Sequence, residues 1–249
     1  MKEFVASNYL IRLLDKSNPD ELKRIQELRY KYLLKIYNED LPEYGLDDDG
    51  YDKYSDTLLV INQENGDICG AYRLATKKTN SSMHFLMEDE YDCTPLKESS
   101  YDFCELSRAF VHKDYQNGLV ITLLFLGIYH YALEHDCKYF IGLCSFHETD
   151  PSKYKHGLSL LKRDYSFNEY VMKAVRNSFP LDYYHGNDID EVEAKKELPS
   201  LLKMYLKFGC LVGFDGSIDY GFNCCDVLLV LNFDNLNKKY LDHFIRMCE

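Results

Sequence analysis

One stretch of the chain, residues 101–136, constrains the fold more than any other; it reads YDFCELSRAFVHKDYQNGLVITLLFLGIYHYALEHD. Its first part is a short apolar run typical of a buried strand, and after a turn with a glycine comes an apolar run long enough for a helix. Two charged residues, Glu105 and Arg108, interrupt the strand. A buried charge is costly unless it is paired or used, so we expect this pair to mark a functional site.

The spacing of Glu105 and Arg108 makes a geometric demand on the strand. Side chains alternate between the two faces of a regular strand, so Glu105 shares a face with Ser107, and Arg108 lies on the other face with Leu106. A β-bulge near Leu106 and Ser107 would bring both charges to one side, and bulges are frequent beside active sites. The alternatives are a structural ion pair or two independent charges at a sheet edge.

A turn of Gln116, Asn117 and Gly118 separates the strand from the helix. Backbone N–H groups at the N-terminus of a helix attract phosphate and other anions, so this turn is a candidate phosphate site. The spacing alone fits an ordinary strand-to-helix turn equally well. His112 lies between the strand and the turn, and we expect it to mark the end of the strand rather than to act as a second base.

The rest of the chain alternates between strand-like and helix-like segments. Pro19 begins the clearest helix, with Ser17 or Asn18 as its cap, and Asn65-Gly66 is the turn of a β-hairpin. Between them, residues 41–56 form an acidic loop that is either a solvated turn region or a functional loop. The order indicates an α+β domain on one central sheet. The other predicted strands are 9–14, 58–61, 68–75, 138–145, 210–214 and 225–233, and the other predicted helices are 154–161, 167–175, 198–208 and 235–249. Residues 216–224 are predicted to form a loop.

Charge and cysteine content exclude several classes of partner. The formal net charge of −12 argues against nucleic acid, whose phosphates need a basic surface. The nine cysteines form no CxxC pair and no zinc-ligand spacing, so we predict reduced thiols and no metal site. We find no signal peptide and no apolar run of membrane-spanning length, and we predict a cytoplasmic protein. Peripheral contact of the closing helix with a membrane surface stays open.

Several blocks of the sequence, in order, resemble those of one family. They are D-x-D-G-Y-D at 47–52, G-A-Y-R-L at 70–74, ELSR at 105–108 with V-H-x-D-Y-x-x-G after it, and YFIGLCSF at 139–146. Together with R-Y-x-x-L at Arg29, and with LPSLLKMYLKFGCLV and FNCCDVLLVLNFDNL near the end, they resemble the ornithine–acyl-carrier-protein N-acyltransferases. These are the hemolysin-like branch of the GNAT superfamily, related to acyl-homoserine-lactone synthases. The resemblance covers about residues 20–245.

The resemblance implies both a fold and an activity. The fold is GNAT-like, a mixed and mostly antiparallel central sheet flanked by helices, in a single domain over 1–249 with a helical insertion at about 150–208. The activity is direct transfer of an acyl group from a thioester to an amine, without a covalent enzyme intermediate. The implied enzyme moves a long-chain or 3-hydroxy acyl group from acyl carrier protein to an amino acid, giving an N-acyl amino acid or a lyso-aminolipid.

The resemblance also implies roles for single residues. Glu105 is the candidate base, because an ammonium group cannot attack a thioester until it loses a proton, and Arg108 would orient Glu105 or hold the carboxylate of the acceptor. The acyl donor would lie along the strand 103–111, with its phosphate at the following turn. Its predicted contacts are Ala109, Phe110, Val111, Gln116, Asn117, Gly118 and Leu119. The predicted acceptor contacts are Arg73, Asp49, Asp52 and Ser145.

The identity of the acyl donor stays open. From Gln116 the chain reads Q-N-G-L-V-I, with one glycine where the common GNAT phosphate loop has Q/R-x-x-G-x-G/A, and this suits the single phosphate of a carrier protein better than the diphosphate of coenzyme A. An acidic carrier protein also needs a basic patch on this acidic chain. The candidates are Lys77-Lys78, Lys153 with Lys155, Lys162-Arg163 and Lys195-Lys196.

Two alternatives to this function stay open. One is a CoA-dependent N-acetyltransferase of a small amine or a protein, and the other is a non-catalytic GNAT-fold protein that binds an acyl carrier or lipid. A strand that retains both Glu105 and Arg108 argues against the non-catalytic alternative. We expect no tightly bound cofactor, with acyl carrier protein or acyl-CoA serving as a co-substrate.

Overall fold

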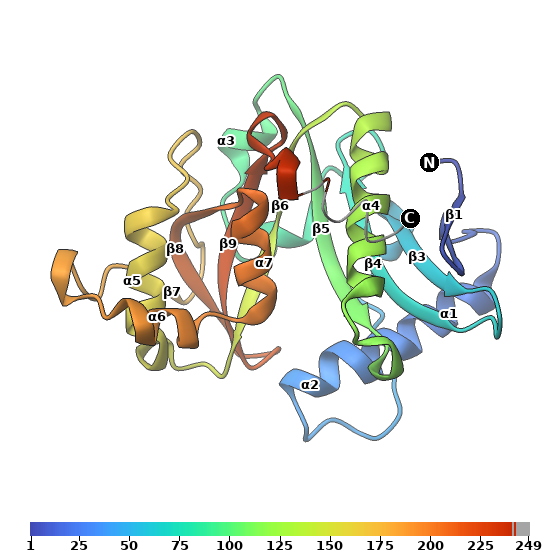
Figure 1. Cartoon of the computed structure of the whole chain (residues 1–249), viewed down its shortest axis with the longest axis horizontal. Helices are drawn as coiled ribbons and strands as arrows, with labels where there is room; N and C mark the ends of the chain where they lie inside the picture. The colour runs from blue at the N-terminus through green and yellow to red at the C-terminus, as the bar shows by residue number, and fades with distance from the viewer. Residues whose placement is uncertain (241, 243–249) are drawn as a thin grey trace. The chain divides into compact units, whose positions relative to one another are not determined.

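The computed structural model describes residues 1–240 and 242, and these divide into two units. The first unit comprises 1–84 and 102–137 with the described residues from 239 onwards, and the second comprises 85–101 and 138–238. Figure 1 shows the elements of both, and each unit is described here by itself.

The first unit contains five antiparallel strands that pair in chain order. The predicted hairpin is confirmed, and Gly66 in its turn has a φ of 76°, which a residue without Cβ adopts freely. The first of the five strands was not predicted, because three residues are too few for a readable alternation. The strands are β1 (Phe4–Ala6), β2 (Tyr9–Leu13), β3 (Asp56–Asn62), β4 (Ile68–Thr76) and β5 (Asp102–Val111).

Two helical segments cover opposite faces of these strands. Helix α1 (Pro19–Arg29) begins at Asn18, whose side chain accepts a hydrogen bond from the backbone N–H of Glu21, and it continues through a π-helical turn (Tyr30–Leu34) into α2 (Lys35–Tyr37). Helix α4 (Leu119–Glu134) packs along β2, β3 and β4 (Figure 1). Leu59 of β3 lies in the core cluster with α1, whereas the neighbouring Leu58 contacts α4. Successive side chains of β3 therefore pack on opposite faces of the sheet, one against α1 and the next against α4.

The second unit contains four antiparallel strands in the order β6-β9-β8-β7. Helices α5 and α6 pack against each other, and α7 ends at Gly209, whose φ of 102° ends the helix in the left-handed region. The strands are β6 (Cys137–His147), β7 (Ser178–Phe179), β8 (Leu211–Asp219) and β9 (Cys224–Asn232). The helices are α3 (Thr94–Lys97), α5 (Lys155–Asp164), α6 (Glu191–Glu197) and α7 (Ser200–Phe208).

Two predictions of secondary structure in this unit are wrong. Residues 167–175 form no helix, because their backbone groups bond to other segments: the N–H of Phe167 donates to the carbonyl of Val212, and that of Val175 donates to Glu90. Residues 216–219 are not a loop, because β8 continues through them to Asp219 and pairs with β9. Of the predicted closing helix at 235–249, residues 238–240 and 242 are helical, residues 235–237 are not α-helical, and residues 241 and 243–249 lie outside the described residues.

The prediction of reduced, buried thiols is confirmed for the eight cysteines that the structure describes. Among the described residues, no helix is both long enough and apolar enough to span a membrane.

Gly127 allows α4 to approach β3 closely. A Cβ atom at this position would lie 2.7 Å from Cδ2 of Leu58 and 3.1 Å from Cγ2 of Ile11, and both side chains are fully buried. We expect Gly127→Val to lower the free energy of unfolding by about 1–3 kcal/mol, because the extra atoms overfill this contact. Urea titration measures the change. Leu133→Ala, at an exposed position of the same helix, is the control and should change stability by less than about 0.5 kcal/mol. Equal effects would contradict the packing argument.

Candidate active site

Strand β5 contains the predicted β-bulge. Ser107 lies opposite Arg73 of β4. Three residues later, Phe110 lies opposite Ala71, which is only two residues before Arg73, so β5 carries one extra residue. Arg108 lies in this bulge with a φ of 52°, a left-handed conformation that is uncommon for a residue with a side chain. The irregularity is confirmed, one residue beyond the predicted position.

The bulge brings Arg108 to the face of β5 that carries Ser107. Nε of Arg73 donates a hydrogen bond of 3.1 Å to Oγ of Ser107. Arg73 and Arg108 both contact the carboxylate of Asp49, so the two guanidinium groups lie on one side. Glu105 belongs to the same face, because it precedes Ser107 by two residues in the regular part of the strand.

Glu105 is a buried carboxylate, only 4% exposed, and it lies opposite Ala75 in the register of β4 and β5. Its negative charge contributes to the pKa of Arg73. Burial alone would lower the pKa of Arg73, but the carboxylates of Asp49, Asp52 and Glu105 together raise it. The candidate base therefore lies within electrostatic range of a fully charged guanidinium group.

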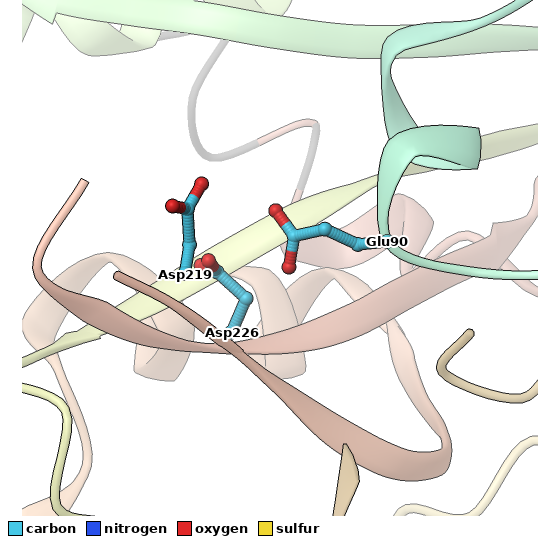
Figure 2. A group of neighbouring side chains, drawn as sticks. All are labelled: Glu90, Asp219 and Asp226. Carbon is cyan, nitrogen blue, oxygen red and sulfur yellow. The ribbon is translucent and has the colours of Figure 1, made fainter. Parts of the chain in front are cut away.

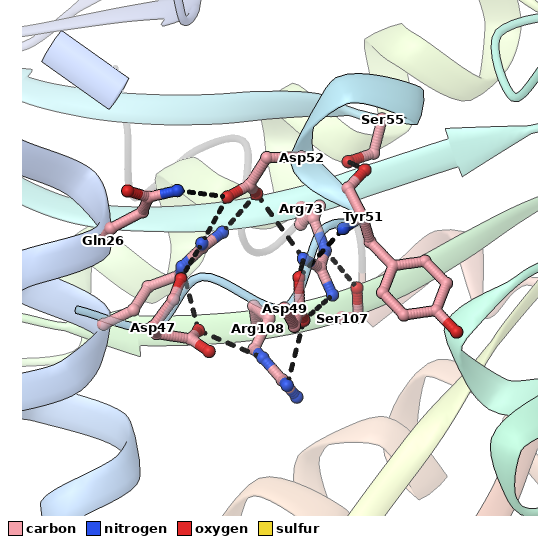
Figure 3. A network of polar contacts seen from close by, with 10 residues as sticks. Gln26, Asp47, Asp49, Tyr51, Asp52, Ser55, Arg73, Ser107 and Arg108 are labelled. Carbon is pink, nitrogen blue, oxygen red and sulfur yellow. Dashed lines mark hydrogen bonds and ion pairs between the residues drawn. The ribbon is translucent and has the colours of Figure 1, made fainter. Parts of the chain in front are cut away.

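Three arginines and three aspartates form a closed ring of alternating charge on this face (Figure 3). Two of the links are bidentate: Arg29 donates to both oxygens of Asp52 at 2.6 Å, and Arg73 donates to both oxygens of Asp49 at 2.7 and 2.8 Å. We call this set the charge ring. Its members, in order around the ring, are Arg29, Asp47, Arg108, Asp49, Arg73 and Asp52.

The other links of the charge ring are single contacts. Oδ2 of Asp47 lies 3.0 Å from Nε of Arg29 and 3.1 Å from Nε of Arg108, as ion pairs without the alignment of a hydrogen bond. Arg108 Nη2 lies 3.0 Å from Asp49, and Arg73 Nη1 lies 3.5 Å from Asp52. Each charged group thus faces two groups of opposite sign.

The acidic loop supplies all three aspartates of the charge ring, and α1, β4 and β5 each supply one arginine. The side chain of Gln26 in α1 donates to Asp52 at 3.1 Å, and the backbone N–H of Asp47 donates to the carbonyl of Gln26. The loop is therefore held against α1 by its own acids and is not merely a solvated turn. Arg29, Asp47 and Gln26 lie in or beside blocks that resemble the family, yet nothing in the sequence assigned them a role.

Two members of the charge ring reach solvent. The side chains of Arg108 and Asp49 are 17% and 16% exposed, whereas the other four are almost fully buried. Burial would raise the pKa of Asp49, but the hydrogen bonds and charge of Arg73, with the charge of Arg108, lower it to about 2. The exposed part of the ring is therefore an ionised carboxylate beside a guanidinium group.

The predicted turn after β5 lies at the N-terminus of α4. Gly118 precedes the helix with a φ of 88°, and the side chain of Asn117 accepts a hydrogen bond of 3.1 Å from the N–H of Leu119. No acidic residue lies in the first turn of the helix, and residues 116–118 are exposed. Such a terminus can receive an anion. His112 follows the end of β5, and its Nε2 lies 2.8 Å from the hydroxyl of Tyr32.

The first unit thus brings together most of the predicted site residues. Glu105, Arg108, Arg73, Asp49 and Asp52 lie on one face, and the predicted donor contacts lie in the second half of β5 and in the turn after it. Ser145 lies in β6 of the second unit, where its hydroxyl donates to Asp226 at 2.5 Å, and its role in acceptor binding stays a prediction.

Comparison with known proteins bears on the fold and on the activity. Residues 28–126 match the model of the acetyltransferase (GNAT) domain family. The chain is 29% identical over 252 residues to an L-ornithine N(alpha)-acyltransferase of Rhodobacter capsulatus, covering 97% of this chain and 96% of that protein. It is also 29% identical over 246 residues to the L-ornithine N(alpha)-acyltransferase of Agrobacterium fabrum, covering 91% and 82% of the two chains.

Among solved structures, the chain is similar to an N-acyl amino acid synthase from uncultured soil microbes. The TM-score is 0.52 at 12% identity, covering 91% of each chain, and this likeness concerns the fold alone. The predicted GNAT fold and the predicted resemblance to ornithine N-acyltransferases are confirmed, and the chain is an acyltransferase enzyme.

A substitution of Asp52 tests how much the charge ring contributes to the stability of the protein. Asp52→Asn removes the charge that faces both Arg29 and Arg73 and leaves their guanidinium groups under-compensated in a buried site. We expect a loss of about 3 kcal/mol in the free energy of unfolding, measured by urea titration. Asp48→Asn is the matched control, because Asp48 is an exposed acid of the same loop, and it should have little effect. A small effect at both positions would show that the ring contributes no stability.

The contribution of Asp49 to the stability of the protein depends on pH. Its pKa is lowered from 3.8 to about 2 on folding, so its ionised form stabilises the protein above pH 4, and this contribution is lost as the pH falls towards 2. We expect Asp49→Asn to cost about 1–2 kcal/mol at pH 6, since solvent screens part of the interaction. Thermal unfolding of both proteins between pH 6 and 2 measures the gap, which should shrink on acidification. A gap that does not change with pH would contradict the assignment.

Proposed function

We propose that this GNAT-fold acyltransferase moves a long-chain acyl group, 3-hydroxyacyl groups included, from acyl carrier protein to the amine of an amino acid. The supporting observation is the bulge in β5, which places a buried carboxylate, Glu105, and a partly exposed guanidinium group, Arg108, on one face. The relatives named L-ornithine N(alpha)-acyltransferases support an amino-acid acceptor. The product is an N-acyl amino acid or a lyso-aminolipid.

In the proposed reaction the acceptor nitrogen attacks the thioester carbon directly. The ammonium first gives a proton to Glu105, through a water molecule, and the free amine then forms the new C–N bond. The C–S bond breaks, and the thiolate of the phosphopantetheine arm leaves and takes up a proton. No covalent enzyme intermediate is formed, and the reaction needs no oxidant or reductant.

The partly exposed pair of Arg108 and Asp49 is the proposed contact for the acceptor. A guanidinium group binds a carboxylate through two parallel hydrogen bonds, so Arg108 suits the α-carboxylate of an amino acid. Asp49 stays ionised at neutral pH and offers a negative charge to an ammonium group. Arg73 and Asp52 are buried behind this pair, and we assign them to holding it in position.

The second half of β5 and the turn after it are the proposed contacts for the donor. Developing negative charge on the thioester oxygen requires a hydrogen-bond donor, and a backbone N–H at the bulge, such as that of Ala109, would serve. The phosphate would lie at residues 116–119, where the N-terminus of α4 is exposed and free of acidic side chains in its first turn.

One observation favours acyl-CoA as the second candidate donor. Several members of the basic clusters that could dock an acidic carrier protein are paired with neighbouring acids within the second unit. Their charge is therefore largely balanced, and electrostatic attraction to an acidic partner is reduced. The pairs are Lys153 with Glu148, Arg163 with Asp164 and Glu191, and Lys196 with Glu193.

Glu105 provides the test of the chemistry. We expect Glu105→Gln to lower kcat by about 10²–10⁴-fold, because the amide cannot accept the proton of the acceptor ammonium. Mass spectrometry measures the N-acyl product over time, with long-chain acyl carrier protein and acyl-CoA as parallel donors and a panel of amino acids as acceptors. Glu64→Gln, in the exposed turn between β3 and β4, is the control and should retain full activity.

Three outcomes of this assay would contradict the proposal. Unchanged turnover in Glu105→Gln would remove Glu105 as the base. Product formation from acyl-CoA alone would remove the carrier protein as donor and would support the second candidate. No N-acyl product with any donor and acceptor would contradict the proposed reaction itself.

A further inference from the structure

A second group of charged residues lies in the second unit and takes no part in the proposed reaction. One carboxylate oxygen from each of Glu90, Asp219 and Asp226 lies within 4.8 Å of the others. Figure 2 shows the side chain of Glu90 directed towards the two aspartates. We call these three residues the carboxylate triad.

Three segments that are distant in the sequence supply the carboxylate triad. Glu90 follows a 3₁₀ turn (Leu86–Asp89), Asp219 ends β8, and Asp226 lies within β9. Asp226 lies opposite Ser217 of β8 and opposite Ser145 of β6. A residue with a hydroxyl group is therefore its neighbour on each of the two adjacent strands.

The two aspartates have some of their oxygens engaged. Asp226 accepts a hydrogen bond of 2.5 Å from the hydroxyl of Ser145 and one of 3.1 Å from the thiol of Cys224. Asp219 accepts two backbone N–H groups of the β8–β9 turn through Oδ1, at 2.7 and 3.0 Å. These hydrogen bonds fix the orientation of both carboxylates without neutralising their charge.

Glu90 is the member of the triad whose environment is incomplete. Its residue is 5% exposed, and its Oε2 is a buried atom with no hydrogen-bond partner among the described residues. The nearest cation is the half-exposed guanidinium group of Arg176, 4.0 Å from Oε1. Burial and the charges of Asp226 and Asp219 raise the pKa of Glu90 to about 8. A buried carboxylate that is directed at two other carboxylates and has an oxygen without a hydrogen-bond partner indicates a missing positive charge.

We propose that Glu90, Asp219 and Asp226 bind one divalent cation of the hard, oxygen-seeking class, Mg²⁺, Mn²⁺ or Ca²⁺. Such ions take carboxylate and hydroxyl oxygens as ligands at about 2.0–2.6 Å, so two ligands of one ion lie at most about 5 Å apart. The mutual separation of the three oxygens meets this limit. The ion gives Oε2 of Glu90 its missing partner and ties the Glu90 segment to the β8–β9 hairpin.

A divalent ion suits the triad better than a single ammonium group. A bound cation keeps all three carboxylates ionised, and a single positive charge would leave two of their three negative charges uncompensated beside two buried side chains, Glu90 and Asp226. The sequence analysis predicted no metal, because the three acids are separated along the chain and form no ligand motif. The proposal concerns a binding site within the second unit and is independent of the proposed reaction.

The experiment uses the full-length protein after dialysis against EDTA and removal of the chelator. Electron paramagnetic resonance of free Mn²⁺ counts the bound ions, and thermal unfolding in Mg²⁺, Mn²⁺ and Ca²⁺ measures the stabilisation. We expect one saturable site per chain and a rise in Tm with at least one of the three ions. Both readouts use the wild-type protein in the absence of acyl donor and acceptor.

Glu90→Gln and Asp182→Asn are the matched variants. Glu90→Gln removes a ligand charge and should weaken binding by about tenfold or more, and it should fold, because it also removes the repulsion within the triad. Asp182 is an exposed acid of the same unit, so Asp182→Asn should bind as the wild type does. Asp226→Asn provides a second ligand variant with the same expected loss.

The outcomes separate the proposal from its rivals. Saturable binding that both ligand variants weaken and Asp182→Asn retains would support it. Binding that Glu90→Gln leaves unchanged would place the ion elsewhere and overturn it. An absence of saturable binding of all three ions at 10 mM would also overturn it. So would stabilisation by ornithine or lysine that Glu90→Gln abolishes, without stabilisation by any of the metal ions, because the occupant of the triad would then be an ammonium group.

Discussion

The charge ring is the interaction on which the first unit depends. Six charged groups are withdrawn from water at one end of α1 and across β4 and β5, and each faces two groups of opposite sign. Desolvation of a single pair often cancels its attraction, but a closed ring removes every unpaired charge. The acidic loop of residues 41–56 cannot leave without depriving the buried Arg29 and Arg73 of their carboxylate partners, so the ring fixes the loop as well as the site. The same arrangement holds Arg108 and Asp49 where solvent, and hence a substrate, can reach them.

The bulge in β5 places the charge ring on the same face of the strand as the candidate base, Glu105. Two charged residues three positions apart cannot share a face of a regular strand, and one extra residue in the strand removes that conflict. The alternation of side chains was enough to predict that an irregularity must exist. It was not enough to place it, because the left-handed backbone of Arg108 is stabilised by contacts with Asp47 and Asp49, which lie some sixty residues earlier in the chain.

The sequence predicted best the features that depend on neighbouring residues. The cap at Asn18, the turn at Gly66 and the turn at Gly118 follow from local chemistry. The helix predicted at 167–175 is wrong because the conformation of this segment depends on distant residues. Its apolar spacing is that of a helix, but its backbone N–H groups donate to the carbonyl groups of Val212 and Glu90. Val171 and Val175 remain exposed. The carboxylate triad could not be predicted at all, since its members come from positions 90, 219 and 226. A site assembled from such distant positions leaves no periodic or spaced pattern.

The two clusters of acids show that the surroundings of a carboxyl group can shift its pKa in either direction. In the charge ring, guanidinium groups lower the pKa of Asp49 to about 2 although the residue is largely buried. In the carboxylate triad, burial and like charges raise the pKa of Glu90 to about 8. Burial acts in the same direction in both places, so the difference comes from the guanidinium groups that contact Asp49, whereas the half-exposed Arg176 lies 4.0 Å from Glu90. In the proposed metal site, a bound cation relieves the repulsion among three carboxylates that lie within 4.8 Å of each other, two of them oriented by hydrogen bonds.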